Sequence, residues 1–388
     1  MPLTLATGMA IDYARASRLQ TRLNAAADAA ALAAVTQSMM KQDNATAKTT
    51  AQNMFNAQAA NLSGLVYDPA NLIVTIVGTV GAANTRTATV SYTAQSINAF
   101  SGVLGSPTIT IGGTSASHAD AAPNIDFYVL LDTSGSMNLP ATSAGLTLLN
   151  SKTGGCSFAC HSTNDATAKN ASGQYTDYYG VATSYGISLR SDEAKKAIQN
   201  MMTLAASTST QNYATYRAAM MTFAAQSTQA NNSFKTLQSL TNNLGDVSTA
   251  AGNAPLSLYY TNGCPKNGYC NNDTDTASSD AFTRMNTIIP APGSGTNVNG
   301  DKPQAFMFVV TDGMRDENRA GGKPEVQFDT ALCDTIKARG IRIAILYTEY
   351  LPGSIANDSW SNSASQGDIA NRLIQIEPAL QTCASSGL

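Results

Sequence analysis

The sequence predicts an α/β protein whose larger part, residues 124–388, is a doubly wound and mostly parallel sheet. An N-terminal helix and a small α+β domain are expected before it. Nearly continuous apolar runs in the larger part are typical of strands covered on both faces, and helical patterns alternate with these runs. Before residue 112 the pattern instead changes to a period of two residues, which is typical of β-strands.

Residues 1–40 predict an Ala-rich helix. Leu19, Leu23 and Ala26 begin a stripe of apolar side chains at spacings of three and four residues, as on one face of an α-helix. Residues 1–11 are apolar but fall short of the ~20 residues that cross a bilayer. We expect them to be the remnant of a membrane anchor, with an ordinary helix start as the alternative.

Residues 41–112 predict the small α+β domain. A second helix is expected over Ala47–Ala60, and alternating residues then mark three strands, namely Leu72–Val77, Ala88–Ala94 and Pro107–Ile111. Helices followed by strands are the pattern of an α+β domain. Residues 113–123 are small and polar, and we expect them to form a linker.

The larger part is expected to contain four buried strands with helices between them. The strands are three continuous apolar runs and one weaker run, namely Ile125–Leu131, Ala305–Val310, Ile341–Tyr347 and Tyr216–Phe223. Apolar residues at helical spacing predict three helices, over Ala194–Ala205, Phe282–Ile289 and Phe328–Ala338. Residues 140–184 and 252–272 show little periodicity, and we interpret both stretches as loop insertions.

The charge composition argues against a nucleic-acid partner. The chain has 388 residues, a formal net charge of −3 and only 13% charged residues. Its Lys and Arg residues are spread thinly along the sequence, whereas a nucleic-acid-binding surface needs them clustered. No apolar run reaches the roughly 18 residues typical of a membrane-spanning helix.

The six cysteines predict disulfide bonds. An even count in surroundings rich in Gly, Asn and Ser fits an oxidising compartment. The pairs closest along the chain are Cys156 with Cys160, Cys264 with Cys270, and Cys333 with Cys383. Sequence alone does not determine the connectivity, and buried free thiols are the alternative.

Side chains that carry oxygen follow two of the predicted buried strands. Asp132, Ser134 and Ser136 come directly after Ile125–Leu131, and Asp312 follows Ala305–Val310. Open α/β sheets bind ligands at the carboxyl ends of their strands. Hard divalent cations prefer oxygen ligands, so the pattern predicts a site for Mg²⁺, with Mn²⁺ or Ca²⁺ as alternatives. Helix N-capping would explain any one of these residues but not two such loops.

The Asp-x-Ser-x-Ser loop after IDFYVLL and Thr311-Asp312-Gly313 after AFMFVV resemble the metal-ion-dependent adhesion site of von Willebrand factor A-type (vWA) domains. The resemblance covers residues 125–388 and implies a Rossmann-like vWA fold. It also implies that the metal is held by Asp132, Ser134, Ser136, Asp312 and a threonine from a middle loop. A carboxylate of a partner protein is then expected to take the open position on the metal.

Three threonines are candidates for the middle-loop ligand. Thr274 occupies the place used in the vWA family, before the helix that leads into the Ala305–Val310 strand, and Thr276 is the near alternative. Thr296 stands in a Gly-Thr-Asn that resembles the family's letters more closely, but it follows that helix. We expect Thr274 to be the ligand.

A second resemblance covers the N-terminus. Residues 10–16 (AIDYARA) and 19–34 (LQTRLNAAADAAALAA) are similar to the opening of TadG-like proteins, assembly components of tight-adherence (Flp) pili. Residues 156–161, 186–190 and 303–313 also look like TadG-type vWA proteins. In that family a membrane helix precedes the Asp12-Tyr13 region, and the vWA domain continues beyond Leu388. The resemblance therefore implies a chain truncated at both ends.

The resemblances imply a pilus assembly or adhesion protein that is not an enzyme. It is expected to be anchored in the inner membrane of a bacterial cell envelope and to bind a pilus, host or matrix component through its metal. A metal-dependent hydrolase, with Asp275 or Asp316 as general base, is one alternative. A purely structural minor pilin is another. Haem and zinc are not expected, because the Cys156-x₃-Cys160-His161 spacing is wrong for haem attachment and the chain has only two histidines.

Overall fold

The structure is a computed structural model that forms two compact units. It describes residues 2–78, 85–155, 168–225, 234–256, 259–260, 264–265, 276–297, 300–317, 325–355, 362–363 and 368–388. The N-terminal unit comprises Met1–Asn124, Thr210–Ala214 and Ser294–Lys302. The C-terminal unit comprises Ile125–Ser209, Thr215–Gly293 and Pro303–Leu388.

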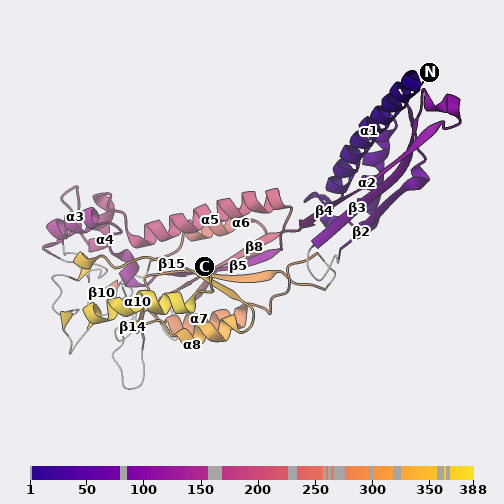
Figure 1. Cartoon of the computed structure of the whole chain (residues 1–388). Helices are drawn as coiled ribbons and strands as arrows, with labels where there is room; N and C mark the ends of the chain where they lie inside the picture. The colour runs from indigo at the N-terminus through magenta and orange to yellow at the C-terminus, as the bar shows by residue number, and fades with distance from the viewer. Residues whose placement is uncertain are drawn as a thin grey trace. The chain divides into compact units, whose positions relative to one another are not determined.

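The N-terminal unit is an antiparallel sheet with two helices on one face (Figure 1). Its helices are α1 (Pro2–Ala33) and α2 (Asn44–Ala59), with short 3₁₀ turns η1 (Met39–Lys41), η2 (Pro69–Asn71) and η3 (Ser101–Leu104). Its strands are β1 (Leu65–Val66), β2 (Leu72–Val77), β3 (Thr85–Ile97) and β4 (Thr108–Asp120). The central strand β3 pairs with β1, β2 and β4, all antiparallel.

Small residues let the helices pack closely on this sheet. The inward side chains of β3 include Val90, which is fully buried in the same hydrophobic cluster as Leu23 of α1 and Phe55 of α2. The alanines of α1 at 26, 27, 30 and 31 are also fully buried, so the Ala-rich stripe packs inside its own unit. The helix expected over residues 1–40 ends earlier, at Ala33, and the 3₁₀ turn η1 follows.

The prediction of a linker at residues 113–123 is wrong. Strand β4 continues through this stretch, paired with β3 from Gly113 opposite Tyr92 to Asp120 opposite Thr85. Only residues 121–124 lie outside regular structure. The small side chains reflect close packing, because a Cβ atom at Gly113 would overlap Asn24 of α1 and the Tyr92 ring.

The C-terminal unit contains a five-stranded sheet in the order β15-β12-β5-β8-β9. The strands are β5 (Ile125–Asp132), β8 (Tyr216–Phe223), β9 (Lys235–Thr241), β12 (Gln304–Thr311) and β15 (Arg342–Tyr347). The first four in space are parallel, and β9 is an antiparallel edge. Residues 128–131 of β5 are buried on both faces, as the continuous apolar run indicated. The predicted fold class is therefore confirmed.

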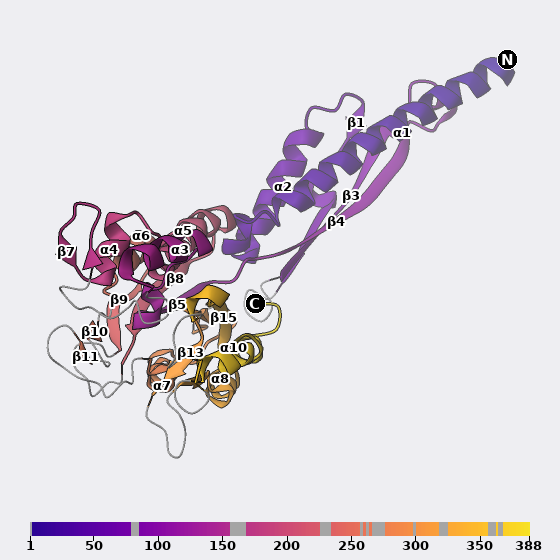
Figure 2. The same ribbon diagram turned by 90° about the vertical axis from the view of Figure 1, so that its left-hand side faces the viewer.

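Helices cover both faces of this sheet. They are α5 (Arg190–Asn212) and α6 (Leu244–Gly252) on one face, with α7 (Ser278–Ile288), α8 (Thr330–Lys337) and α10 (Ile369–Cys383) on the other (Figure 2). The helices predicted over Ala194–Ala205, Phe282–Ile289 and Phe328–Ala338 correspond to α5, α7 and α8. Among the described residues, no helix is both long and apolar enough to cross a bilayer.

The described residues of the stretch 140–184, which was predicted to be a loop insertion, form regular structure. They include α3 (Ser143–Thr153), the short strands β6 (Ala168–Lys169) and β7 (Tyr175–Thr176), and α4 (Tyr178–Ser184). Leu149 and Val181 are buried in the main core, which explains why the helices form despite a weak local pattern. Residues 252–272 include a small hairpin of β10 (Tyr259–Tyr260) and β11 (Cys264–Pro265), and their other residues lie largely outside the described part. A further hairpin joins β13 (Met314–Asp316) to β14 (Glu325–Gln327).

Candidate metal centre

Two acidic loops meet at the carboxyl edge of the parallel sheet. Strand β5 ends at Asp132 and its neighbour β12 ends at Thr311, with Val310 paired to Leu131. The Thr311 hydroxyl donates to Asp132 Oδ2 over 2.7 Å. The sequence predicted that the Asp132 and Asp312 loops meet if their strands are neighbours. The parallel pairing of β5 with β12 brings the two loops together in this way.

The loop that begins at Asp132 brings the side-chain oxygens of Ser134 and Ser136 close together. The Ser134 N–H donates to Asp132 Oδ1 over 2.9 Å, and the hydroxyl oxygens of Ser134 and Ser136 are 3.2 Å apart. A 3₁₀ turn, η4 (Gly135–Asn138), follows at once and holds the second serine in place. Asp132 and Ser134 are fully buried, whereas Ser136 is partly exposed. Ser136 is therefore the ligand candidate of this loop that solvent reaches.

Asp312 supplies a second buried carboxylate. Its Oδ1 accepts the Met314 N–H over 3.2 Å, and its Oδ2 lies 3.4 Å from Arg190 Nη1. Burial raises the pKa of Asp132 to about 7 and the charge of Asp312 raises it as well, while hydrogen bonds from Ser134 and Thr311 oppose the shift. Two mutually repelling carboxylates beside two hydroxyls form a donor set that suits a hard divalent cation.

The candidate ligands that the described residues bring to this edge are carboxylates and hydroxyls. Within the described part of the chain, no three side chains of His, Cys, Asp or Glu gather as a metal cluster. His118 lies in the N-terminal unit on β4, where its Nδ1 is 3.0 Å from the Thr87 hydroxyl. Oxygen ligands of this kind favour Mg²⁺ over softer ions.

Arg190 and Tyr350 belong to the same site, and sequence reasoning missed their roles. Arg190 begins α5 with 2% exposure, and its guanidinium carbon lies 4.1 Å from the centre of the Tyr350 ring. The pKa of Tyr350 is well above 10, because its hydroxyl is buried and faces the Asp312 carboxylate. Arg190 ends the stretch 186–190 that resembles TadG-type proteins, but that resemblance gave it no role, and Tyr350 lies in no stretch singled out from the sequence. Their position beside Asp312 is what identifies them.

The three candidate threonines have different surroundings. Thr274 lies outside the described residues. Thr276 is buried, and its N–H donates to Asp316 O while the next residue, Ala277, donates to Ala224 O. Asp316 follows β12 and Ala224 follows β8, so Thr276 lies at the carboxyl edge of the sheet. Thr296 instead donates both its N–H and its hydroxyl to Asp301, in the segment that precedes the amino end of β12.

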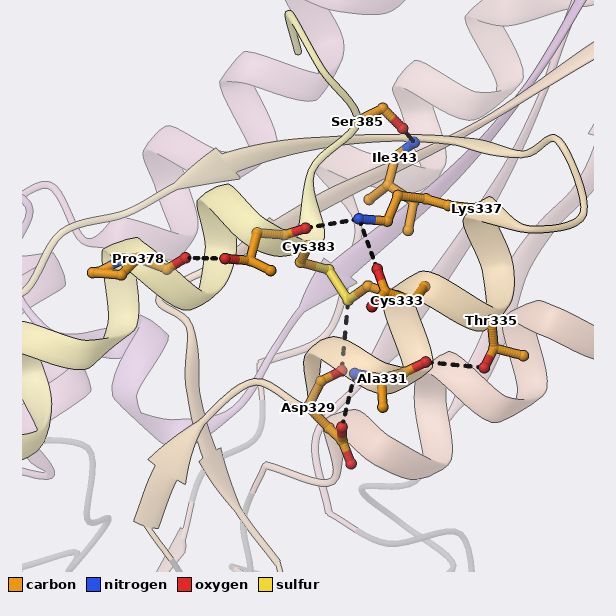
Figure 3. The surroundings of a disulfide bond; sticks show 11 residues. Asp329, Ala331, Cys333, Thr335, Lys337, Ile343, Pro378, Cys383 and Ser385 are labelled. Atoms are coloured by element: carbon orange, nitrogen blue, oxygen red, sulfur yellow. Dashed lines mark hydrogen bonds and ion pairs between the residues drawn. A yellow bond between two sulfur atoms is a disulfide. The ribbon is translucent and has the colours of Figure 1, made fainter.

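A disulfide bond joins two helices of the C-terminal unit. Cys333 of α8 and Cys383 of α10 are bonded, with Cα atoms 5.1 Å apart and both side chains fully buried (Figure 3). Lys337 Nζ donates to Thr382 O beside the bond. This predicted pair is confirmed, and disulfides of this kind are typical of oxidising compartments. Cys156, Cys160, Cys270 and the Cys264 side chain lie outside the described residues.

Comparisons with known proteins identify the N-terminus most directly. Residues 1–38 match the family of Flp pilus-assembly TadE/G-like proteins. No curated protein matches the chain. Among solved structures, it is similar to the pilus adhesin SpaC from Lactobacillus rhamnosus GG, at 11% identity and a TM-score of 0.35. That match covers 82% of this chain and 32% of the adhesin, so the chain spans about a third of the adhesin's length.

A second solved structure is also similar. It is an uncharacterised membrane-spanning protein from Vibrio fischeri, at 12% identity and a TM-score of 0.20, and the match covers 58% of this chain and 91% of that protein. Both structural scores are too low to carry a functional argument. The family match over residues 1–38 does not depend on these structural scores. The N-terminal region of this chain is therefore TadE/G-like, as the sequence resemblance implied.

Proposed function

We propose that the C-terminal unit binds a divalent cation, Mg²⁺ in the first place, and uses it to bind a carboxylate of a partner protein. The observation that carries this proposal is the pair of buried carboxylates, Asp132 and Asp312, because burial and then the charge of Asp312 raise the pKa of Asp132. A cation between them would offset the cost of burying two like charges. The neighbouring Ser134 and Ser136 hydroxyls supply the neutral oxygens that such an ion needs.

The side chains have distinct roles in this proposal. Asp132 and the two serines would hold the ion directly. Asp312 would act through water, because its oxygens already face the Met314 N–H and Arg190. For the middle-loop ligand we propose Thr276, because its backbone lies at the same edge of the sheet, and Thr274 stays the alternative expected from the sequence. The cation would supply a Lewis-acidic position for an anionic ligand, next to the partly exposed Ser136.

The proposed setting is a bacterial adhesion pilus. The TadE/G-like match of residues 1–38 and the buried disulfide support a protein of the cell envelope, exposed to an oxidising compartment. We place α1 next to the inner membrane and the metal site in the periplasm or at the surface, where the partner is a pilus, host or matrix component. This is a binding role, with no nucleic-acid partner and no catalysis.

Calorimetric titration of the whole chain with Mg²⁺ and Mn²⁺ tests the proposal. The wild type should bind one ion per chain, and Asp132→Ala should lose most of that affinity. Ser134→Ala should weaken binding less, because a neutral ligand is removed and the negative charge is kept. Thr296→Ala is the matched control, since its hydroxyl is bonded to Asp301, and it should bind like the wild type. Equal affinity in Asp132→Ala and the wild type would exclude the site.

The carboxylate part of the proposal has its own test. Water-proton relaxation of the Mn²⁺-loaded chain reports water molecules bound to the ion. A short peptide containing Glu should lower the relaxation enhancement by displacing such a water, while the same peptide with Gln should not. Hydrolysis of phosphate or peptide substrates in the same samples, abolished by Asp132→Ala, would favour the hydrolase alternative instead.

A further inference from the structure

Arg190 is fixed in place by the segment that leaves the metal loop. Its N–H donates to Leu139 O over 3.0 Å, and the preceding residue, Leu189, pairs with Pro140 in an antiparallel bridge. Leu139 comes three residues after Ser136 in the sequence. The first turn of α5 is therefore attached to the loop that carries Asp132, Ser134 and Ser136, and the Arg190 side chain enters the buried side of the site.

The Arg190 guanidinium makes few of the hydrogen bonds that it could donate. Its Nη1 faces Asp312 Oδ2 at 3.4 Å, a long distance for a charged hydrogen bond. Its Nε and Nη2 are buried, and no described residue accepts a hydrogen bond from them. A buried ion pair with unsatisfied donors is a poor source of stability. Its clearest effect is electrostatic, since it places one positive charge next to a candidate cation site.

We infer that Arg190 is an internal counter-cation that competes with the divalent ion for Asp312 and keeps the metal affinity of the site low. The inference rests on the proposed function and adds its regulation. Without metal, Arg190 partly balances Asp132 and Asp312. With a divalent ion bound, the buried groups together carry one surplus positive charge, counting two carboxylates, the ion and the guanidinium. An anionic ligand on the ion removes that surplus, so metal and partner carboxylate bind cooperatively.

Charge-removing and charge-keeping variants separate this role from a structural one. In Arg190→Gln the whole chain should bind Mg²⁺ at least about tenfold more tightly than the wild type, because a nearby repelling charge is gone. Arg190→Lys keeps the charge and should stay within a few-fold of the wild type. Without metal, Arg190→Gln should be less stable, and Mg²⁺ should raise its melting temperature more than that of the wild type.

Arg217→Gln is the matched control. Arg217 also pairs with a buried aspartate, Asp126, over 2.7 and 2.6 Å, but at the amino ends of β8 and β5. Asp126 is six residues before Asp132 in β5, about 20 Å away along an extended strand. This variant makes the same change in net charge and breaks a comparable pair, yet it should leave the Mg²⁺ affinity unchanged. If Arg190→Gln and Arg217→Gln both bind Mg²⁺ more tightly than the wild type, the effect comes from net charge alone and the inference is overturned.

A spectroscopic measurement on the wild type covers the case in which Arg190→Gln does not fold. The Nε–H resonance of Arg190, assigned by its absence in Arg190→Lys, should move when Mg²⁺ binds, as Asp312 turns toward the ion. If the wild type binds Mg²⁺ and this resonance stays in place, or if Arg190→Gln binds no more tightly, Arg190 does not compete and the inference fails alone. If the wild type binds no divalent ion, the proposed function fails with it.

Discussion

The hydroxyl of Thr311 donates to the carboxylate of Asp132, joining the last residues of two neighbouring parallel strands. The same hydroxyl oxygen accepts the Gly313 N–H over 3.0 Å. One side chain therefore connects the Asp132 loop to the backbone that follows Asp312. Because Asp132 is fully buried, this bond also satisfies an oxygen that water does not reach.

Replacing Thr311 by Val tests this connection. The change keeps the branched shape and removes the hydroxyl, leaving Asp132 Oδ2 without its donor and the Gly313 N–H without its acceptor. Urea unfolding should show a loss of about 1–3 kcal/mol, the range for a buried polar group left unpaired. Mg²⁺ affinity should fall as well, because Asp132 loses its fixed orientation. Unchanged stability and affinity would mean that the two loops are held by other contacts.

The choice of middle-loop threonine predicts opposite results for two similar variants. Thr276→Ala should weaken Mg²⁺ binding about as much as Ser134→Ala, because each removes one neutral oxygen. Thr296→Ala should leave Mg²⁺ binding as it is in the wild type, since Thr296 is bonded to Asp301. Calorimetry on both variants decides between them. Loss of binding in Thr274→Ala, with Thr276→Ala unaffected, would return the role to Thr274.

The acid response of the N-terminal unit should depend on Asp12. Its carboxylate accepts the N–H groups of Ala99, Phe100 and Ser101, tying α1 to the turn η3. Burial raises the pKa of Asp12, but these three hydrogen bonds outweigh it and lower the pKa to about 2. A lowered pKa stabilises the fold above the unfolded value near 4. This stability is lost as the pH falls toward 2.

Hydrogen exchange at residues 99–101 measures this effect. In the wild type, protection of these amides should decline between about pH 4 and pH 2, after correction for intrinsic exchange rates. In Asp12→Asn the protection should be lower at neutral pH and should change little across the same window. A similar decline in Asp12→Asn would assign the acid response to other carboxylates, such as Asp43, which caps α2.

The disulfide should contribute strongly to the stability of the C-terminal unit. Cys333 and Cys383 are separated by 50 residues, and closing a loop of that length restricts the unfolded chain by about 4 kcal/mol in the chain-entropy model. The double variant Cys333→Ser, Cys383→Ser should unfold at lower urea concentration by a corresponding amount. Adding a reductant should bring the wild type toward the double variant, and no shift in either case would show that the packing of α8 on α10 is sufficient.

The sequence determined the parts of this protein that depend on local patterns. The strand Leu72–Val77 has the predicted bounds. The runs that form β5, β8 and β12 are recognisable because these strands are largely buried, whereas β15 is buried fully only at Ile343. The sequence also predicted that the Asp132 and Asp312 loops lie together, because each loop comes directly after a buried strand. Helix α10 was missed, although Ile369, Leu373, Ile376 and Leu380 carry a helical spacing that could have revealed it.

Only the tertiary structure decided the features that depend on distant partners. Residues 113–120 look like a linker by composition, yet they form a strand because β3 offers a full row of hydrogen-bonding groups and α1 needs small residues beneath it. The half-buried edge strand β9 has a weak pattern and forms by pairing with β8. Arg190 ends a stretch that resembles TadG-type proteins, but nothing in that stretch indicates a role beside a metal. Its place beside Asp312 arises from long-range packing, which the residues around it in the sequence do not encode.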